Sequence, residues 1–427
     1  MFFDRPQSGE RALLVHLVFH HRTLEEDSSE FELLAQSAGV NKALDLTVTI
    51  NDPSPKFFIG SGKVDEIAQY VQEYAIELVL FNCALTPTQE RNLESALKCR
   101  VVDRTTLILD IFAQRARTAE GKLQVELAQL KHVSTRLVRG WTHLQKQKGG
   151  IGLRGPGETQ LETDRRLIRQ RMKSLQLRLE RVRSQRQQSR KAREKAEIPT
   201  IALVGYTNAG KSTLFNWLTA ADAYTENLLF ATLDPTLRKL ILPAFGPVVF
   251  VDTVGFIRNL PHQLVDAFRA TLEETEKADL LLHVVDLASQ HREEDMAEVE
   301  AVLSELDVSE IPRLLVYNKI DLLRGEPRID YDESGKPWRV WVSAREQSGK
   351  DELFKAIPTL LSQDRLVGQI VLQASMGQLR ALLYQHNAVL HEQVLPEGQT
   401  VLQINIARKD WRQFLSKTQL TEAQVGL

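Results

Sequence analysis

The chain has 427 residues, which is too long for one hydrophobic core and suggests about two to four domains. Its hydrophobic fraction of 43% and charged fraction of 26% are those of an ordinary soluble globular protein. No apolar run reaches the roughly 18–20 residues that would span a bilayer, residues 1–10 lack the apolar core of a signal peptide, and the two cysteines have no metal-binding spacing. We therefore expect a cytoplasmic protein without stable membrane insertion, at most in peripheral association with a membrane.

Charge is unevenly distributed along the chain. Residues 100–197 contain 24 Lys and Arg against 10 Asp and Glu, and the remainder contains 30 against 46. A basic middle segment in an acidic protein is typical of binding to a polyanion. The alternative is a solvated helix face whose positive sign has no function.

The first part of the chain, residues 1–112, alternates strand-like and helix-like segments. The expected strands are Ala12–Phe19, Leu46–Ile50, Leu78–Phe81 and Val101–Val102. The expected helices are Leu24–Ala38, Val64–Tyr74 and Thr86–Leu97. This alternation predicts a small α/β domain built on a parallel sheet.

Residues 113–197 have the apolar period of a coiled coil. The seam positions of a first arm, apolar except for Ser134, recur at alternating spacings of four and three: Leu123, Leu127, Leu130, Ser134, Leu137, Trp141 and Leu144. Those of a second arm recur every seven residues, with two intermediate positions: Leu161, Ile168, Leu175 and Val182, with Met172 and Leu179. Residues 149–157 between the arms hold five glycines and one proline, which cannot continue a helix. We expect an antiparallel helical hairpin, roughly 50 Å long, with a glycine-rich tip.

A third α/β unit, expected over residues 198–363, begins with a phosphate-binding loop. The apolar strand Thr200–Val204 runs into Gly205–Ser212, which matches the pattern GxxxxGK[ST]. The glycines allow backbone N–H groups to turn toward a β-phosphate, and the following helix points its N-terminus at the same anion. Lys211 is expected to contact the β- and γ-phosphates, and the Ser212 hydroxyl to bind Mg²⁺.

Three further motifs each follow a strand-like run. Asp252–Gly255 has the pattern DxxG, which contacts the metal shell and the γ-phosphate. Asn318–Asp321 has the pattern NKxD, in which the Asp321 carboxylate can accept two hydrogen bonds from guanine but none in that arrangement from adenine. Ser343 and Ala344 follow a strand at 339–341 and can place backbone amides near the guanine oxygen. Because ligands bind at the carboxyl ends of strands in open α/β sheets, these motifs predict a Ras-like P-loop GTPase domain.

The segment between the phosphate loop and DxxG, Phe230–Thr236, is expected to sense the γ-phosphate. Thr232 is our predicted Mg²⁺ ligand and Thr236 the alternative, because spacing alone does not separate them. Phe256 follows DxxG, where many GTPases place a glutamine that orients the attacking water. Phenylalanine cannot orient water, so we predict slow intrinsic hydrolysis that depends on a partner or on another group. Asn208 could help K⁺ to sit where an arginine finger would otherwise supply charge.

These motifs define the predicted sites. The catalytic residues are Lys211, Thr232 and Gly255, and the metal ligands are Ser212, Thr232 and Asp252. The predicted nucleotide-binding residues are Gly205, Tyr206, Thr207, Asn208, Ala209, Gly210, Lys211, Ser212, Thr213, Phe230, Ala231, Thr232, Leu233, Asp234, Asp252, Thr253, Val254, Gly255, Asn318, Lys319, Ile320, Asp321, Ser343, Ala344 and Arg345. The predicted RNA-binding residues, in the hairpin tip, are Gly149, Gly150, Gly152, Arg154, Gly155 and Gly157.

The remaining residues, 364–427, predict a small C-terminal domain with both helices and strands. We expect strands at Val367–Gln373 and Thr400–Ile406, and helices at Gly377–His386 and Lys409–Leu415. Together these elements would form a compact β-α-β unit.

The nucleotide motifs resemble those of the TrmE–Era–Obg class of translation-associated GTPases. A longer upstream signature narrows the resemblance to the HflX family: Asp103-Arg104-Thr105, Gln124–Leu130, Gly149–Gly157 and Glu158–Arg166. The resemblance spans the whole chain, including a tail that some members lack.

This resemblance implies a GTP hydrolase that binds GTP, GDP and Mg²⁺ and associates with the large ribosomal subunit. HflX proteins are implicated in splitting stalled or idle ribosomes, notably under stress, and their hairpin tip is expected to reach ribosomal RNA near the peptidyl-transferase region. Family members also hydrolyse ATP weakly, and some have been assigned RNA-unwinding activity through the N-terminal domain. We expect a monomer.

Two other functions are open on the residues alone. One is a nucleotide-gated regulatory switch whose hairpin recruits a protein partner. The other is an ATP-dependent RNA-remodelling enzyme in which the GTPase domain is regulatory. The basic middle segment favours RNA over an acidic protein as the partner.

Overall fold

The computed structural model divides the chain into two compact units. The residues described by the structure are 9–19, 24–137, 156–195, 198–220, 229–243, 245–258, 272–306, 308, 310–362, 365–386, 388–395, 399–407, 411, 414–415, 417–418 and 420. The first unit comprises residues 1–182, 226–234 and 259–269, and the second comprises residues 183–225, 235–258 and 270–427. None of the described helices is both long and apolar enough to cross a membrane.

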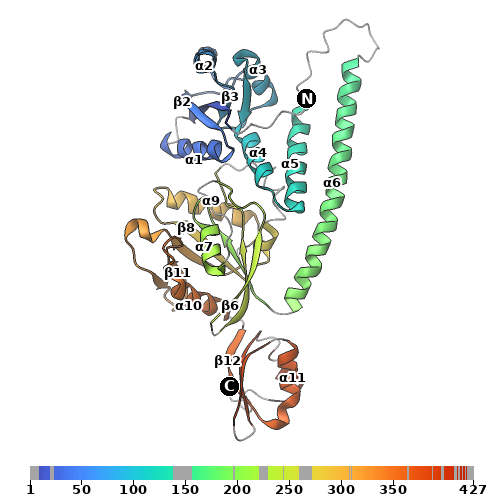
Figure 1. The fold of residues 1–427 in the computed structure, drawn as a ribbon, viewed down its shortest axis with the longest axis vertical. Coiled ribbons are helices and arrows are strands. Elements are labelled where there is room, and N and C mark those ends of the chain that lie inside the picture. The colour runs from blue at the N-terminus through green and yellow to red at the C-terminus, as the bar shows by residue number, and fades with distance from the viewer. Residues whose placement is uncertain are drawn as a thin grey trace. The chain divides into compact units, whose positions relative to one another are not determined.

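A four-stranded parallel sheet forms the centre of the N-terminal domain (Figure 1). Its strands, in the spatial order β2-β1-β3-β4, are β1 (Arg11–Phe19), β2 (Asn41–Ile50), β3 (Leu78–Phe81) and β4 (Arg100–Asp103). The helices of this domain are α1 (Leu24–Ser37), α2 (Ser61–Glu73), α3 (Pro87–Leu97) and α4 (Arg104–Arg115). Parallel neighbours need a crossover connection, and one helix lies between each pair of consecutive strands. The predicted parallel α/β architecture is confirmed.

Local sequence explains several of the element boundaries. Thr86 and Gln89 form a capping box at the start of α3: the Thr86 side chain accepts from the Gln89 N–H at 3.3 Å, and Gln89 Oε1 accepts from the Thr86 N–H at 3.0 Å. Pro87 sits in the first turn, where its missing N–H costs nothing. The strand β2 begins at Asn41 rather than at the predicted Leu46, because β2 is an edge strand whose first half is largely solvent-facing and therefore polar.

Two long helices, α5 (Ala119–Leu137) and α6 (Pro156–Lys195), lie side by side in Figure 1 and are joined by an ion pair of 2.6 Å between Arg171 and Glu126. The 40 residues of α6 correspond to a rod about 60 Å long. In α6 two residues of the predicted stripe, Leu175 and Leu179, are buried, whereas Ile168, Met172 and Val182 are half-buried.

The predicted seam of the first arm is out of phase with the observed burial in α5. The buried apolar side chains described there are Val125 and Ala128, whereas the predicted Leu123, Leu127 and Leu130 are half-buried. The reason is that α5 also packs against α4, so part of its apolar face is buried against that helix. The predicted seam positions Trp141 and Leu144 lie outside the described residues.

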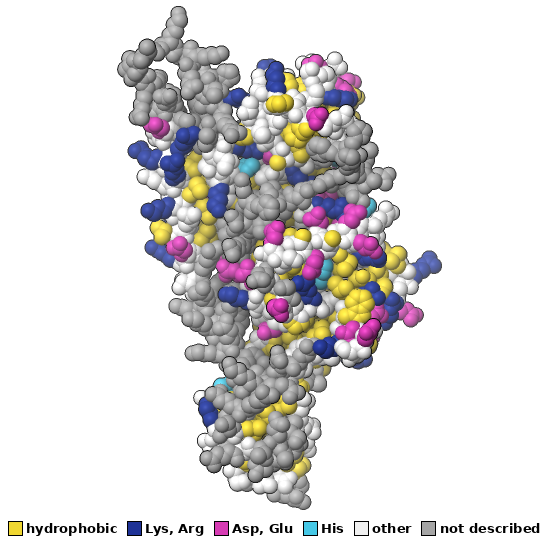
Figure 2. Space-filling view, turned by 180° about the vertical axis from the view of Figure 1, so that it is seen from behind, with side chains coloured by type: hydrophobic (Ala, Val, Ile, Leu, Met, Phe, Trp, Pro, Cys, Tyr) yellow, Lys and Arg dark blue, Asp and Glu magenta, His cyan; other side chains and the backbone are white. Residues whose placement is uncertain are grey.

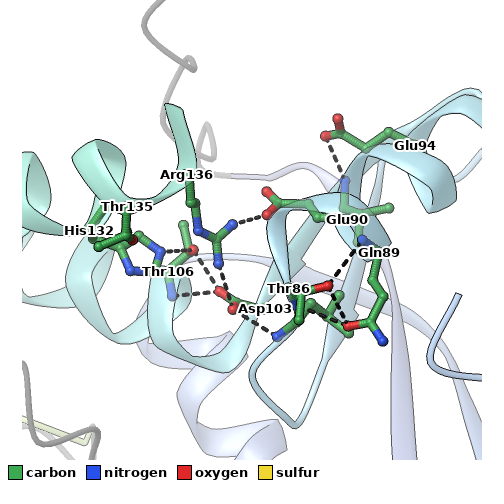
Figure 3. A network of polar contacts seen from close by, with 11 residues as sticks. Thr86, Gln89, Glu90, Glu94, Asp103, Thr106, His132, Thr135 and Arg136 are labelled. Atoms are coloured by element: carbon green, nitrogen blue, oxygen red, sulfur yellow. Dashed lines mark hydrogen bonds and ion pairs between the residues drawn. The ribbon is translucent and has the colours of Figure 1, made fainter. Parts of the chain in front are cut away.

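A buried polar network fastens α5 to the sheet of the N-terminal domain (Figure 3). Asp103 Oδ2 accepts hydrogen bonds from the Arg136 guanidinium at 2.7 Å and the Leu85 N–H at 3.1 Å, and Oδ1 accepts from the Thr106 N–H at 2.9 Å. Arg136 also pairs with Glu90 of α3, and burial lowers the pKa of Arg136 to about 10. Because Asp103 is only 1% exposed, its charge has to be matched by such partners. The network therefore gives Asp103 a structural role.

The second unit contains a seven-stranded sheet in the order β10-β11-β9-β8-β5-β7-β6. Its strands are β5 (Thr200–Val204), β6 (Thr236–Leu242), β7 (Gly246–Asp252), β8 (Leu280–Asp286), β9 (Arg313–Asn318), β10 (Arg328–Tyr331) and β11 (Pro337–Trp341). The described helices of this domain are α7 (Lys211–Thr219), α9 (Arg292–Glu305), α10 (Lys350–Leu361) and the 3₁₀ helix η2 (Ile320–Leu323). The five central strands are parallel, while β6 and β10 form antiparallel edges. The predicted P-loop GTPase fold is confirmed.

The C-terminal domain is a three-stranded antiparallel sheet in the order β12-β14-β13. Its elements are β12 (Arg365–Leu372), η4 (Ala374–Met376), α11 (Gly377–Gln385), β13 (Val389–Val394) and β14 (Thr400–Ala407). The strand β13 was not predicted, because it is an edge strand with polar residues in its middle. The predicted helix Lys409–Leu415 lies partly outside the described residues.

Candidate nucleotide-binding site

The phosphate loop connects β5 to α7, and two of its glycines have no room for a side chain. Gly205 has φ +150°, and a Cβ there would lie 2.3 Å from the Val284 carbonyl oxygen. Gly210 has φ +92°, and a Cβ there would lie 2.2 Å from Asn318 Nδ2. The two glycines of the pattern GxxxxGK[ST] are therefore needed for the loop to pass this close to β8 and β9.

The side chain of Lys211, the first residue of α7, extends into this loop. Its ammonium group donates hydrogen bonds to the carbonyl oxygens of Gly205 at 3.0 Å and Tyr206 at 2.7 Å. Burial lowers its pKa to about 8, with the charge of Asp252 opposing that shift. The Lys211 side chain is thus held inside the loop, where an anionic phosphate would restore full charging.

Two of the predicted metal ligands are adjacent. Ser212 Oγ, on the first turn of α7, donates to Asp252 Oδ2 at the end of β7 at 2.7 Å. A hydroxyl and a carboxylate oxygen are the donor types that Mg²⁺ prefers. Asp252 is buried, so its charge favours a cation at this position.

The third predicted metal ligand belongs to a different compact unit from the other two. Thr232 belongs to the first unit, whereas Ser212 and Asp252 belong to the second. The alternative, Thr236, begins β6 and is paired with Asp252 across the sheet. The strand pairing therefore places Thr236 beside Asp252 in the sheet, and the choice between the threonines stays a prediction.

The residues after DxxG lie directly on the phosphate loop. The Thr207 N–H donates to the Phe256 carbonyl at 2.7 Å, and the Phe256 N–H donates to the Gly205 carbonyl at 3.1 Å. A Cβ on Gly255 would lie 2.9 Å from Lys211 Nζ and 2.9 Å from Thr207 Cα. Gly255 therefore occupies the space in front of the ammonium group, and only glycine fits there.

Arg258 holds the same segment from its other side, a feature that the sequence did not reveal. Its N–H donates to the Tyr206 hydroxyl at 3.0 Å, and its guanidinium lies 2.9 Å from Asp295 and 3.0 Å from Glu294 of α9. The acidic partners come from a helix 37 residues later in the chain, so no local pattern could have identified them.

Asn318 joins three of the predicted motifs. Its Nδ2 donates to the Ala209 carbonyl of the phosphate loop at 2.9 Å, and its Oδ1 accepts from the Ala344 N–H at 3.0 Å. Next to it, Asp321 Oδ1 accepts from Ser343 Oγ at 2.6 Å. This arrangement brings the phosphate loop, NKxD and the Ser343-Ala344 segment into one place at the carboxyl ends of the strands.

Other members of the predicted set mainly support the fold. Thr253 is fully buried, and its Oγ1 donates to the Leu203 carbonyl at 2.5 Å. Ile320 is buried in a small core with Val285 and Leu287. Lys319 adopts a left-handed backbone conformation, and its ammonium group pairs with Asp286 at 2.6 Å.

The predicted γ-phosphate sensor packs within the first unit. Phe230 is buried against Phe112 of α4, with ring centroids 4.6 Å apart, and the Leu229 N–H donates to Ser37 Oγ at 2.9 Å. The Asp234 carboxylate accepts hydrogen bonds from residues 117 and 118, just before α5. The described contacts of residues 229–234 are thus those of a segment anchored to the N-terminal domain.

Comparison with known proteins identifies the family. Residues 25–113 match the model of a GTP-binding GTPase N-terminal region, residues 115–193 that of its middle region, and residues 200–319 that of a 50S ribosome-binding GTPase. GTPase HflX from Escherichia coli (strain K12) is 56% identical over 413 residues, which cover 96% of this chain and 97% of that protein. The chain belongs to the HflX family of GTPases.

A second curated relative of this HflX-family chain agrees with that assignment. GTPase HflX from Caldanaerobacter subterraneus subsp. tengcongensis is 51% identical over 348 residues, which cover 82% of this chain and 80% of that protein. Among solved structures, a GTP-binding protein from the hyperthermophilic archaeon Sulfolobus solfataricus in complex with GDP is 26% identical, covering 83% of this chain and 99% of that one, with a TM-score of 0.45.

The RNA-binding residues predicted for this HflX-family chain mostly lie outside the described residues. This applies to Gly149, Gly150, Gly152, Arg154 and Gly155. Gly157 is the second residue of α6, so the glycine-rich segment ends inside the first turn of a helix that begins at Pro156. Proline is favoured at that first position.

Proposed function

We propose that this GTPase uses its nucleotide cycle to act on the large ribosomal subunit, splitting or rescuing stalled or idle ribosomes, particularly under stress. Its reaction, as a GTPase of the HflX family, is the hydrolysis of GTP to GDP and phosphate. The observation that supports the nucleotide cycle in this proposal is the pair of hydrogen bonds made by Asn318, which link the phosphate loop to the base-recognition segments.

The site residues divide the work of binding GTP. Loop amides and Lys211 would hold the β- and γ-phosphates, and the Asp321 carboxylate would accept hydrogen bonds from guanine. Ser212 and Asp252, and one of the threonines Thr232 or Thr236, would hold Mg²⁺. When bound, that ion neutralises charge on the phosphate oxygens.

Hydrolysis needs a change at Gly255 and Phe256. Because Gly255 lies in front of the Lys211 ammonium group, a γ-phosphate can reach Lys211 only when the two hydrogen bonds between Phe256 and the phosphate loop open. Since Phe256 cannot orient water, we infer slow turnover that rises with a partner. K⁺ near Asn208 is a second source of charge, and hydrolysis rates in K⁺ and Na⁺ buffers test it.

Two observations support the ribosome as the partner. The family model matched by residues 200–319 describes a 50S ribosome-binding GTPase. Residues 100–197, which include α5 and α6, carry the strong excess of positive charge noted above. Neutralising RNA phosphates with Lys and Arg releases counterions, so binding to RNA should weaken steeply with salt.

Co-sedimentation with purified large subunits tests this function. We expect tighter binding with a non-hydrolysable GTP analogue than with GDP, a steep loss with rising salt, and weaker binding when residues 149–157 are replaced by a short linker. Binding that ignores both salt and nucleotide would contradict the proposal and favour a regulatory switch with a protein partner. The splitting step is tested by light scattering, which monitors the separation of intact ribosomes into subunits in the presence of GTP, ATP or neither.

A further inference from the structure

A ladder of alternating aromatic rings and guanidinium groups covers one end of the seven-stranded sheet. It consists of Arg328, Trp341, Arg339, Trp338 and Tyr317. The Arg328 guanidinium lies 3.7 Å from the centre of the Trp341 ring, and that of Arg339 lies 4.3 Å from the Trp338 ring and 4.9 Å from the Tyr317 ring. Figure 2 shows hydrophobic side chains and Lys and Arg side chains close together on the side of the second unit that carries β11.

One carboxylate holds three of the five ladder residues in place. Asp330 of β10 accepts hydrogen bonds from Arg339 Nε at 2.7 Å, Trp341 Nε1 at 2.8 Å and Arg328 Nε at 3.3 Å. These contacts come from the paired strands β10 and β11, in which Arg328 faces Trp341 and Asp330 faces Arg339. The planar groups of Arg328, Arg339 and Trp341 are therefore fixed before any partner binds, which lowers the entropy cost of binding.

Two planes of the ladder face solvent. Trp338 is 39% exposed, with Arg339 over its ring, and the Arg328 side chain is 51% exposed, with Trp341 on its inner side. Among the described residues, the two terminal nitrogens of Arg328 have no hydrogen-bond partner. The ladder thus offers flat surfaces for stacking beside unused N–H donors.

Charge favours an anionic partner. The ladder contains two guanidinium groups, and with the carboxylate of Asp330 that binds them it still carries a net positive charge. The acidic Asp332 lies in the turn of the hairpin, where its Oδ1 accepts from the N–H groups of Ser334 and Lys336, and the Arg328–Trp341 pair lies at the opposite end of the two strands. A partner on that pair would avoid the acidic turn.

Flat surfaces with positive charge and free N–H donors are the features that bind unpaired nucleic-acid bases and their phosphates. Bases stack on aromatic rings and on guanidinium planes, and guanidinium groups bind phosphate oxygens in pairs. We propose that the Arg–aromatic ladder is a stacking site for single-stranded RNA. This inference rests on the proposed function only in taking RNA as the available nucleic acid.

Binding of the full-length protein to a short, labelled, single-stranded RNA tests the site by fluorescence anisotropy. Measurement at physiological ionic strength reduces unspecific phosphate contacts of the basic segment. We expect Trp338→Ala to weaken binding about tenfold, equivalent to about 1.4 kcal/mol, and Trp338→Phe to bind like the parent protein. Arg328→Ala should weaken binding and also reduce its dependence on salt.

Tyr384→Ala is the matched control, because Tyr384 is also an exposed ring, at 47%, with the guanidinium of Arg380 lying over it. It should leave RNA binding unchanged. Equal RNA affinity for the parent, Trp338→Ala and Arg328→Ala proteins would overturn the proposal, and so would an equal loss in the Tyr384→Ala control.

Large-subunit co-sedimentation separates this site from the function of the whole chain. If Trp338→Ala loses subunit binding but keeps its affinity for free RNA, the ladder contacts a ribosomal protein and the RNA assignment is wrong. Failure of the parent protein to bind large subunits would instead contradict the proposed function. The stacking site would still be tested by the binding of the protein to free RNA.

Discussion

The carboxylate of Asp234 caps the start of α5 at Thr118. Its Oδ2 accepts from the Thr118 N–H and the Arg117 N–H, both at 2.8 Å, and its Oδ1 accepts from Thr118 Oγ1 at 2.5 Å. Thr118 Oγ1 in turn accepts from the Gly121 N–H at 2.9 Å. A residue predicted to bind nucleotide therefore satisfies the free N–H groups that precede a helix.

Removal of this cap should lower stability. We expect Asp234→Ala to reduce the free energy of unfolding by about 1 kcal/mol, a typical loss for a helix cap, while Asp234→Asn keeps most of it. Urea denaturation followed by circular dichroism measures the difference. Gly121→Ala should have a similar or larger effect, because a Cβ at that position would lie 2.1 Å from Asp234 Oδ1. Identical unfolding midpoints for all four proteins would show that the cap contributes nothing.

The Asp321 carboxylate should decide the choice of base. Asp321→Asn replaces an acceptor with a group that can donate, so we expect weak binding of GTP and strong binding of xanthosine triphosphate. Competition with a fluorescent GDP analogue measures both affinities. An unchanged preference for GTP would contradict the assignment of the whole guanine-binding site.

Gly255→Ala should uncouple hydrolysis from binding. The added methyl group would lie 2.9 Å from both Thr207 Cα and Lys211 Nζ, so it would fill the space in front of the ammonium group that a γ-phosphate needs. We expect the hydrolysis rate to fall about 100-fold, as when a transition-state donor is lost, with nearly unchanged GDP affinity. Single-turnover measurements of phosphate release test this, and a rate equal to that of the parent protein would refute it.

The two candidate threonines can be separated by their effect on magnesium dependence. If Thr232 is the ligand, as predicted, Thr232→Ala should raise the Mg²⁺ concentration needed for half-maximal hydrolysis at least several-fold, while Thr236→Ala should not. If instead Thr236→Ala raises the Mg²⁺ requirement and Thr232→Ala does not, the ligand is Thr236, which is paired with Asp252 in the sheet. Titration of Mg²⁺ at saturating GTP supplies the measurement, with Thr219→Ala as a control threonine remote from both motifs.

Stability should fall in acid because of His283. Burial in β8 lowers the pKa of His283 from 6.5 to about 4, so the unfolded chain binds more protons than the folded one between these values. The free energy of unfolding therefore rises with pH across this window. Titration of His283 lowers it by roughly 3 kcal/mol when the pH falls from 7 to 4. His283→Gln removes the titration, so its unfolding midpoint should depend less on pH between 6.5 and 4. Parallel pH profiles for the two proteins would contradict the prediction.

The sequence by itself determined the chemistry that depends on consecutive residues. Gly205–Ser212 and Asn318–Asp321 could be identified directly, because a phosphate loop and a base-recognition turn each require particular residue types at fixed short spacings. Apolar periodicity likewise predicted the parallel sheet of the N-terminal domain, since buried strands and amphipathic helices have different periods. It failed at β10 and β13, where edge strands expose polar residues and lose the pattern.

Only the tertiary structure decided which residues from these distant parts of the chain contact one another. Asn318 binds Ala209 across 109 residues, and Asp234 caps a helix that begins more than a hundred residues earlier in the chain. Asp103 meets Arg136 only because α5 packs back onto the sheet. Partners that are distant in sequence leave no periodic or spaced signal, because their contact arises from chain packing rather than from local backbone geometry.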